Sequence, residues 1–240
     1  MILKKIINTV KDNKSRHKRT EALTNELIWA NVYHDSIRGV ACLNNLSINI
    51  GRWAGNYSFF YILKRILFDL KPESILELGL GESSKFVSTL VSNNILQSSH
   101  IIIEHDKEWI KKFNKEFELS GSSEIKHFEA IDKDVLNQKY LGYQDIEKLQ
   151  NNFSLYIIDG PFGSSSYSRY DIVELAKMFT QDKEFIIIID DYNRAGEKET
   201  AESLLQVLKE KSIDVNYKCY SGSKSQLVIV TKSYKMALSL

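Results

Sequence analysis

Short apolar runs alternate with longer amphipathic segments from residue 74 onward. Runs rich in Ile, Val and Leu predict seven strands, over 75–78, 101–104, 125–130, 155–158, 185–189, 215–220 and 226–231. Most of them are separated by segments whose apolar residues have helical spacing, which favours a mainly parallel sheet with helices on both faces. The last two strands are separated only by Ser-Gly-Ser-Lys at 221–224, which is too short for a crossover helix. These two strands are therefore predicted to pair antiparallel.

The pattern before residue 71 is helical but interrupted. Helical spacing over 20–70 breaks near 44–56, where Gly and Asn gather, and an apolar helix follows over 57–70. We therefore expect a helical extension or cap over residues 1–70 and a doubly wound α/β domain over residues 71–240.

The opening segment, residues 1–19, predicts an amphipathic basic helix. Its apolar side chains share one helical face among Lys and Arg residues: Ile2, Leu3, Ile6, Ile7 and Val10. Such a helix is typical of peripheral contact with an anionic membrane surface. Packing of the same stripe on the main domain, or on a second subunit of a homo-oligomer, is the alternative.

Composition narrows the class of protein. With 240 residues, 43% of them hydrophobic, the chain can bury a substantial core. Lys and Arg number 32 against 31 Asp and Glu, so no overall basic field favours nucleic acid as a partner. Cys42 and Cys219 form no Cys-x-x-Cys pair, which argues against a zinc cluster and a disulfide scaffold. With no apolar run near the ~18 residues of a membrane span, we expect a cytoplasmic protein, and contact with the inner membrane surface stays open.

One strand leads into a glycine-rich turn. Residues 74–84 read SILELGLGESS, and Gly79 and Gly81 would let the backbone approach a nucleotide-like ligand. A helix beginning near Ser83 would present free N–H groups at the same place. Ser83 stands where dinucleotide-binding proteins have a third glycine, and no Gly-Lys-Ser/Thr follows, which counts against a P-loop. An ordinary strand-to-helix turn is the alternative.

Acidic residues end or follow four of the next strands. Glu104 ends the second strand, where a carboxylate can accept hydrogen bonds from ribose hydroxyls, and Asp132 follows the third. Asp159 closes the fourth strand, and Asp190 and Asp191 close the fifth. Carboxylates at adjacent strand ends suit Mg²⁺ or a similar cation. Capping of nearby helices and turns is the alternative for these acids.

Four landmarks carry a resemblance to a known family: ELGLGESS at 77–84, EHD at 104–106, DGPFG at 159–163 and DDYNRAGE at 190–197. Over about residues 50 to 232 the chain resembles a bacterial branch of the class I S-adenosylmethionine-dependent methyltransferases. The resemblance implies a Rossmann-like, mainly parallel seven-stranded sheet ending in an antiparallel hairpin, with S-adenosylmethionine as methyl donor. The implied donor-binding residues are Glu77, Gly79, Gly81, Ser83, Ser84, Glu104, His105, Asp132 and Asp159. Among them, Glu77 would meet the donor's ammonium group and Asp132 its adenine.

The resemblance also implies catalytic residues. Metal-dependent O-methyltransferases of this superfamily hold a divalent cation between an acid after the fourth strand and a pair after the fifth. Asp159, Asp190 and Asp191 match that layout, so they are the candidate metal ligands, with Mg²⁺ as a possible ion. Asp159, Asp191 and Arg194 are the candidate catalytic residues, and either acid could act as general base without a metal. Arg194 and Glu197 would brace the acids or form an exposed ion pair.

The expected activity is methyl transfer to a hydroxyl of a small or carbohydrate-type acceptor, as in polysaccharide biosynthesis. Arg52, Trp53, Asn56 and Tyr57 suit sugar recognition, and the Ser- and Tyr-rich loop 163–170 is a second candidate; an ordinary packing face is the alternative for the first group. Two other functions stay open. One is an NAD-dependent oxidoreductase, which the serine at 83 and the terminal hairpin disfavour, and the other is a silent binding module whose working part is residues 1–19.

Overall fold

The main sheet of the computed structural model, which describes residues 2–51, 53–149 and 152–240, has seven strands in the order β3-β2-β1-β6-β7-β9-β8. The strands are β1 (Ser74–Leu78), β2 (Ser99–Glu104), β3 (Ser123–His127), β6 (Leu155–Ile158), β7 (Ile186–Ile189), β8 (Asn216–Ser221) and β9 (Ser225–Val230). The first five in space are parallel, and β9 is antiparallel to both its neighbours. The predicted terminal hairpin is confirmed, and its second strand inserts between β7 and β8.

The strand order reverses between β1 and β6. The chain runs outward from β1 through β2 to β3 and then returns to the other side of β1. The two loops that follow β1 and β6 therefore leave the sheet in opposite directions, which opens a crevice at the carboxyl ends of these strands. β6 and β7 are buried at every position, as expected for central parallel strands covered on both faces.

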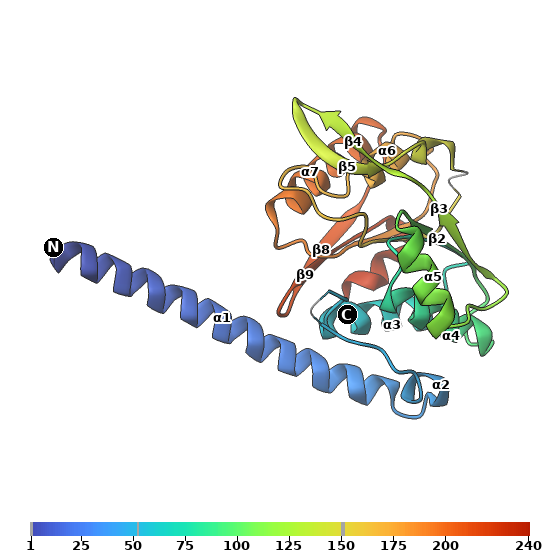
Figure 1. The fold of residues 1–240 in the computed structure, drawn as a ribbon, viewed down its shortest axis with the longest axis horizontal. Coiled ribbons are helices and arrows are strands. Elements are labelled where there is room, and N and C mark those ends of the chain that lie inside the picture. The colour runs from blue at the N-terminus through green and yellow to red at the C-terminus, as the bar shows by residue number, and fades with distance from the viewer. Residues whose placement is uncertain (1, 52, 150–151) are drawn as a thin grey trace.

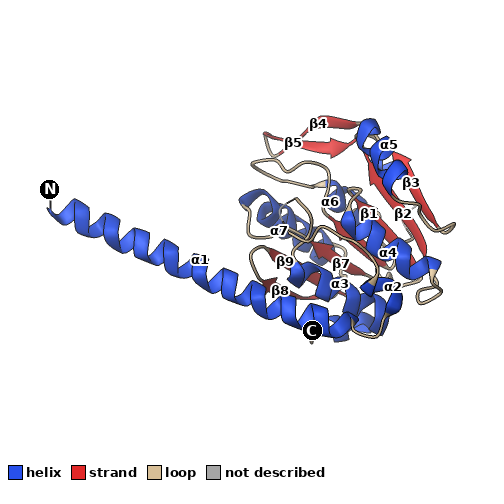
Figure 2. Cartoon of the chain, turned by 60° about the horizontal axis from the view of Figure 1, so that its bottom comes forward, coloured by secondary structure: helices blue, strands red, loops and turns tan. Residues whose placement is uncertain are grey.

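One face of the sheet is covered by α3 (Tyr57–Asp69) and α4 (Glu82–Ser92), with the end of the long helix α1 outside them (Figure 2). Buried Phe60 and Leu63 of α3 belong to the same hydrophobic cluster as Ile157 of β6. The boundary predicted at residue 70 thus divides one core, because α3 is a layer of the α/β domain. The short helices α2 (Ala41–Asn44) and η2 (Lys232–Leu238) complete this side.

The opposite face carries α6 (Asp171–Ala176) and α7 (Ala195–Glu210), whose buried residues cluster with β1, β6 and β7. α5 (Lys107–Glu116) packs Phe113 against Ile102 near the β3 edge. A short turn, η1 (Ile146–Lys148), packs beneath α6. The sheet is thus buried between two helical layers, and its carboxyl edge remains for a site.

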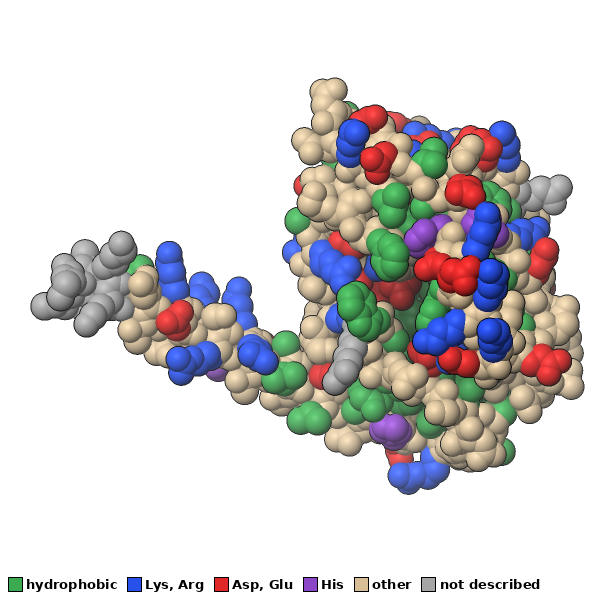
Figure 3. Space-filling view, in the orientation of Figure 1, with side chains coloured by type: hydrophobic (Ala, Val, Ile, Leu, Met, Phe, Trp, Pro, Cys, Tyr) green, Lys and Arg blue, Asp and Glu red, His purple; other side chains and the backbone are tan. Residues whose placement is uncertain are grey.

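Helix α1 (Ile2–Ile37) has 36 residues and extends far from the body (Figure 1). Its second half packs on the domain, where Tyr33 is 2% exposed. Residues 7–21 are all exposed, and Lys and Arg side chains cover much of this projecting part (Figure 3). The expected packing on the chain's own domain is therefore absent over residues 7–21, and contact with a membrane or second subunit stays a prediction. Among the described helices, none has the length and apolar character needed to cross a membrane.

A second sheet is the hairpin of β4 (Ala130–Val135) and β5 (Gln138–Tyr143), at the top of Figure 1. The prediction of one strand over 125–130 was wrong in its bounds, because β3 ends at residue 127 and the hairpin follows. Its turn at Leu136 and Asn137 has φ values of 48° and 62°, as in the tight turns that suit hairpins, but without the glycine that usually marks them. Asp132 lies inside β4, exposed, opposite Leu141. It therefore does not directly follow the third strand.

Asp171 joins this hairpin to α6. The side chain is 0% exposed, its Oδ1 accepts the N–H of Tyr143 at 3.0 Å, and Oδ1 lies 3.5 Å from Lys133 Nζ. Burial raises the pKa of Asp171 to about 7, and Lys133 and the N–H of Tyr143 only partly oppose it. Because the folded protein holds this proton more tightly than the unfolded chain, the stability that it contributes is lost as pH rises through about 7.

Asp171→Asn is expected to remove this pH-dependent loss of stability, while the amide oxygen still accepts the N–H of Tyr143. A shift of about three pKa units corresponds to about 4 kcal/mol of unfolding free energy, lost in the wild type between the acid range and pH 8. Thermal unfolding from pH 4 to 8 measures it, and the Tm of the variant should fall less across this range. Asp134→Asn, the same change at an exposed position of β4, is the control. Parallel Tm profiles for wild type and D171N would contradict the prediction.

Candidate active site

The turns after β1 and β6 touch each other at the reversal of strand order. Gly79 has φ of 101°, and a Cβ there would lie 2.9 Å from the backbone nitrogen of Gly160. The N–H of Asp159 also donates to the carbonyl of Leu78 at 3.0 Å. At Gly81, by contrast, a Cβ would meet nothing within 4 Å. Glycine at 79 is therefore required by contact between two backbones, whereas Gly81 faces open space where a ligand can approach.

Glu104 lies beside this turn, as predicted. It is 5% exposed; Oε2 accepts the N–H of Leu80 at 3.0 Å, and Oε1 accepts those of His105 and Asp106 at 2.7 and 2.9 Å. The His105 ring contacts Phe162 edge to face, with centroids 5.2 Å apart. The carboxylate thus ties the end of β2 to the glycine turn, and its role toward ribose stays a prediction.

Glu77 does not face the crevice. It is 0% exposed; Oε2 pairs with His100 Nε2 at 3.0 Å, and Oε1 accepts a hydrogen bond from Ser83 Oγ. Ser84 Oγ accepts the N–H of Gly81 at 3.0 Å. The prediction that Glu77 directly meets the donor is wrong, because its carboxylate is enclosed by protein on a central strand. Glu77, Ser83 and Ser84 shape the turn from inside.

The acids after β6 and β7 converge. One carboxylate oxygen from each of Asp159, Asp190 and Asp191 lies within 4.8 Å of the others, which confirms the predicted cluster. Arg169, 4% exposed, lies among them with Nη2 3.0 Å from Asp159 Oδ1 and 2.9 Å from Asp191 Oδ2. Lys224 Nζ is 3.4 Å from Asp191 Oδ1 and 3.9 Å from Asp190 Oδ2. Two buried or half-buried cations of the chain, Arg169 and Lys224, therefore contact all three carboxylates.

Burial and these cations shift the pKa values of the three acids in different directions. Burial raises the pKa of Asp159 to about 7, with Asp190 and Asp191 adding to the rise and Arg169 opposing it. Burial, together with the charge of Asp191, also raises the pKa of Asp190. Burial acts in the same direction on Asp191, but Arg169, Lys224 and Arg194 outweigh it and lower the pKa of Asp191. Asp191 therefore stays a carboxylate, whereas Asp159 can take up or release a proton near neutral pH.

Arg194 directly precedes α7, as its N-cap residue, and braces the cluster. Its Nη1 lies 3.0 Å from Asp191 Oδ2 and 3.7 Å from Glu197 Oε1, and its side chain is 49% exposed. Glu197 is itself 0% exposed and accepts from Ser168 Oγ at 3.0 Å. Of the two predicted alternatives, an exposed ion pair and support of the acids, these contacts fit support of the acids. A catalytic role of Arg194 stays a prediction.

Sequence reasoning missed Arg169, Lys224 and Trp109. Arg169 lies in the loop 163–170 that was assigned to substrate, and Lys224 lies in the turn between β8 and β9. Trp109 of α5 donates from Nε1 to the carbonyl of Leu80 at 2.8 Å and is 36% exposed beside the glycine turn. No local motif marks these residues, because each reaches the crevice through a tertiary contact.

The predicted sugar-binding group is only partly accessible. Asn56 is 1% exposed and binds Gln226 and Glu26, and the N–H of Tyr57 also donates to Glu26, so these groups support the structure. Trp53 is 94% exposed, and Arg52 lies outside the described residues. This segment lies near the acids, since Lys224, which contacts Asp190 and Asp191, donates from Nζ to the carbonyl of Ala54 at 3.0 Å.

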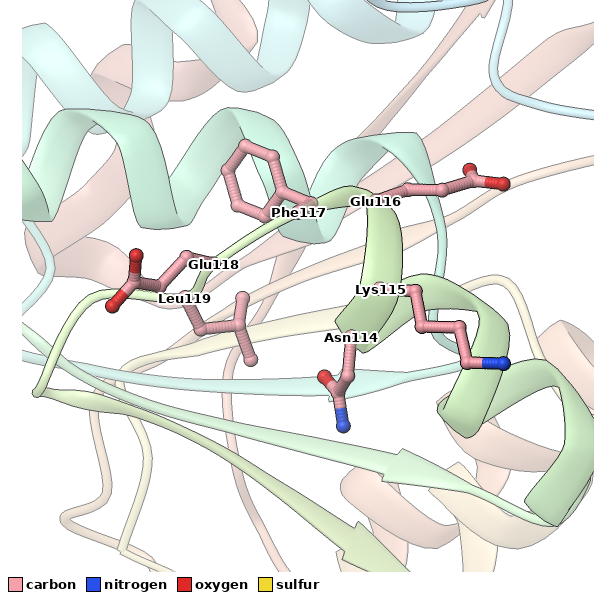
Figure 4. Close-up of a pocket in the computed structure, with 6 residues that line it drawn as sticks. All are labelled: Asn114, Lys115, Glu116, Phe117, Glu118 and Leu119. Atoms are coloured by element: carbon pink, nitrogen blue, oxygen red, sulfur yellow. The ribbon is translucent and has the colours of Figure 1, made fainter.

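Figure 3 shows acidic and hydrophobic side chains gathered around a recess in the middle of the body. A separate surface concavity of about 580 Å³ lies at the end of α5, lined by the continuous stretch Asn114–Leu119. Its polar side chains point away from one another (Figure 4). A binding site needs converging polar groups, so the carboxyl edge of the sheet, where three acids converge, is the better candidate.

Comparison with known proteins supports the fold. No family model and no curated protein matches the chain. Among solved structures, an O-methyltransferase from Bacillus cereus in complex with SAH aligns at a TM-score of 0.50 and 11% identity, covering 89% of this chain and 100% of that one. A putative caffeoyl-CoA O-methyltransferase from Staphylococcus aureus aligns at 0.49 and 12%, covering 87% and 99%. An SAH-bound methyltransferase from Podospora anserina aligns at 0.43 and 13%, covering 83% and 95%. The chain therefore has the Rossmann-like fold of the class I methyltransferases.

Proposed function

We propose that this protein is an S-adenosylmethionine-dependent methyltransferase that acts on a hydroxyl oxygen. The observation that carries the proposal is the meeting of the glycine turn, Glu104 and Asp159 at the reversal of strand order. A ligand that carries ribose and a charged group suits this edge, where a carboxylate, helix-terminal N–H groups and an open glycine lie together.

The donor would bind over the glycine turn. The open space at Gly81 would let the donor lie directly against the backbone of the turn. Glu104 Oε2 accepts one N–H group, from Leu80, and keeps a lone pair for a ribose hydroxyl. Trp109 and Phe162, 36% and 67% exposed, offer apolar surface near that turn for adenine. His105, which lies between Glu104 and Phe162, would contact the edge of the adenine ring. Asp132, the predicted adenine contact, would reach the donor only from its place on the β4–β5 hairpin.

Asp159 is the proposed general base. It adjoins Gly160 at the glycine turn, and its side chain is 20% exposed, against 4% for Asp191. S-adenosylmethionine supplies a methyl group on a positively charged sulfur. The acceptor O–H gives its proton to the Asp159 carboxylate, an O–CH₃ bond forms, the S–CH₃ bond breaks, and S-adenosylhomocysteine leaves. A base whose pKa lies near neutral pH suits this proton transfer.

The acceptor class proposed is a small diol or carbohydrate, as in polysaccharide biosynthesis in the cytoplasm. Support comes from Trp53, an almost fully exposed aromatic next to Ala54, whose carbonyl binds Lys224 of the acidic cluster, since sugars stack on such rings. The alternative of a binding module that never meets a methyl donor is tested by the same experiment as the main proposal.

Isothermal titration of the full chain with S-adenosylhomocysteine should show one site, and titration with NAD⁺ should show none. Asp159→Asn should bind S-adenosylhomocysteine normally yet transfer methyl groups about 100- to 1,000-fold more slowly, because the proton acceptor is lost. Transfer is measured as S-adenosylhomocysteine released with a panel of saccharides and catechol. Asp69→Asn, the same change in an exposed ion pair on α3, is the control. Absence of donor binding would refute the methyltransferase, and full activity of D159N would refute the role of Asp159.

A further inference from the structure

We propose that Arg169 and Lys224 act in place of a divalent cation, so that the three converging aspartates work without a metal ion. The catalytic part of this inference rests on the proposed function. The claim that the two cations take the place of a metal ion rests only on contacts within the chain. The two side chains would neutralise the acids and hold Asp191 charged, and they would supply the positive field that a developing oxyanion of the acceptor needs.

Arg169 occupies the space that an ion would need. Its Nη2 lies 3.0 Å from Asp159 Oδ1 and 2.9 Å from Asp191 Oδ2, and Nη1 donates to the carbonyl of Asp190 at 3.1 Å. Mg²⁺ binds carboxylate oxygens at about 2.1 Å in octahedral geometry. An ion that bridged Asp159 and Asp191 would therefore collide with the guanidinium group, which would have to leave.

The backbone holds Arg169 in this place. Arg169 and Asp191 are paired non-glycine residues with left-handed φ values of 60° and 56°. Such conformations are unfavourable for residues with a side chain and persist where the surroundings demand them. The carbonyl of Ser168, just before Arg169, accepts from Thr200 Oγ1 at 2.7 Å, which anchors the loop to α7. The arginine is thus built into the cluster by the loop that carries it.

Charge at the cluster is already nearly balanced. Four carboxylates, of Asp159, Asp190, Asp191 and Glu197, face three cations, of Arg169, Arg194 and Lys224. A divalent ion added to the same set would reverse a small net negative charge, so the chain's own cations leave the acids little excess negative charge for an ion to neutralise.

Lys224 is positioned by α1. The turn that carries it is held by Glu26, whose Oε2 accepts the N–H of Ser223 at 2.7 Å, and by Trp29, whose Nε1 donates to the carbonyl of Ser221 at 3.0 Å. Lys224 Nζ also donates to the carbonyl of Ala54 at 3.0 Å. The packed half of the long helix therefore sets where the second cation lies.

Direct binding of Mn²⁺, measured by electron paramagnetic resonance on the full chain, tests the proposal. The wild type should leave Mn²⁺ free at millimolar concentration, and EDTA or Mg²⁺ should not change its Tm. Lys224→Met and Arg169→Met should lower the Tm, and millimolar Mn²⁺ should restore part of it, with bound Mn²⁺ detected, since the acids then lack a cation. Lys232→Met, at an exposed position of η2, is the control and should show neither effect.

Two results would overturn the proposal. One is Mn²⁺ bound by the wild type at micromolar concentration and lost in Asp191→Asn. The other is a Tm and Mn²⁺ affinity of K224M equal to those of the wild type. Lys224→Met keeps the test decisive if Arg169→Met does not fold, because Lys224 lies in a hairpin turn. Titration with S-adenosylhomocysteine separates the two proposals, since a chain that binds neither donor nor Mn²⁺ refutes methyl transfer and leaves the role of the cations standing.

Discussion

Gly160→Ala is expected to weaken binding of S-adenosylhomocysteine at least about 100-fold and to lower the free energy of unfolding by about 1–3 kcal/mol. A Cβ at residue 160 would lie 2.7 Å from Gly79 Cα and 2.8 Å from Gly79 N. Because both atoms belong to backbone, the clash can be relieved only if the turns after β1 and β6 separate. That separation would move the glycine turn away from Glu104, the proposed acceptor for the donor's ribose.

Isothermal titration and thermal unfolding measure the two effects. Gly121→Ala is the matched control, because a Cβ there meets nothing within 4 Å and residue 121 lies at an exposed turn. Gly81→Ala makes a sharper comparison, since its Cβ also enters open space. G81A should keep the wild-type Tm but bind the donor more weakly. Unchanged donor binding in G160A would mean that the donor does not use this turn.

Glu104→Ala is expected to lose donor binding by about 100-fold and to lower the free energy of unfolding by about 3 kcal/mol. The wild-type carboxylate accepts the N–H groups of Leu80, His105 and Asp106 while being 5% exposed. Its removal leaves these donors without an acceptor and frees the glycine turn from the end of β2. The expected charge-assisted bonds to ribose would disappear with it.

Titration with S-adenosylhomocysteine and urea unfolding measure this prediction. Glu104→Gln should be intermediate, because an amide keeps one acceptor oxygen but turns an NH₂ group toward backbone donors. Glu108→Ala, at a carboxylate that is 80% exposed in the first turn of α5, is the control. Donor affinity of E104A within a few fold of the wild type would show that ribose is held elsewhere.

Strand prediction succeeded where a short run of residues is apolar throughout and has to be buried. β6 and β7 are short, wholly apolar runs, and both are strands within a residue of their predicted bounds and neighbours in the sheet, as expected. It failed at β4 and β5, whose polar residues and glycine-free turn resemble a loop. Local spacing could not show that β9 inserts between β7 and β8, because strand order is decided by which faces pack together.

The candidate site divides in the same way. Carboxylates at Glu104, Asp159 and Asp191 could be placed from the sequence, because parallel strands bring their carboxyl ends to one edge. The direction of the Glu77 side chain could not, because a neighbouring strand supplies His100 as its buried partner. Nor could the pairing of Arg169 with Asp159 and Asp191, which depends on a loop returning over the sheet.

By itself, the sequence of this protein determined the alternation of strands and helices, the glycine turn and the acids that end the strands, since periodicity and chain geometry are local properties. Only the tertiary structure decided which charges meet. Lys224, Arg169 and Glu26 come from three distant segments, and their contacts arise from folding of the whole chain. Their positions decide how the acids are neutralised, because the energy of a buried charge depends on the partners that packing brings within a few ångströms of it.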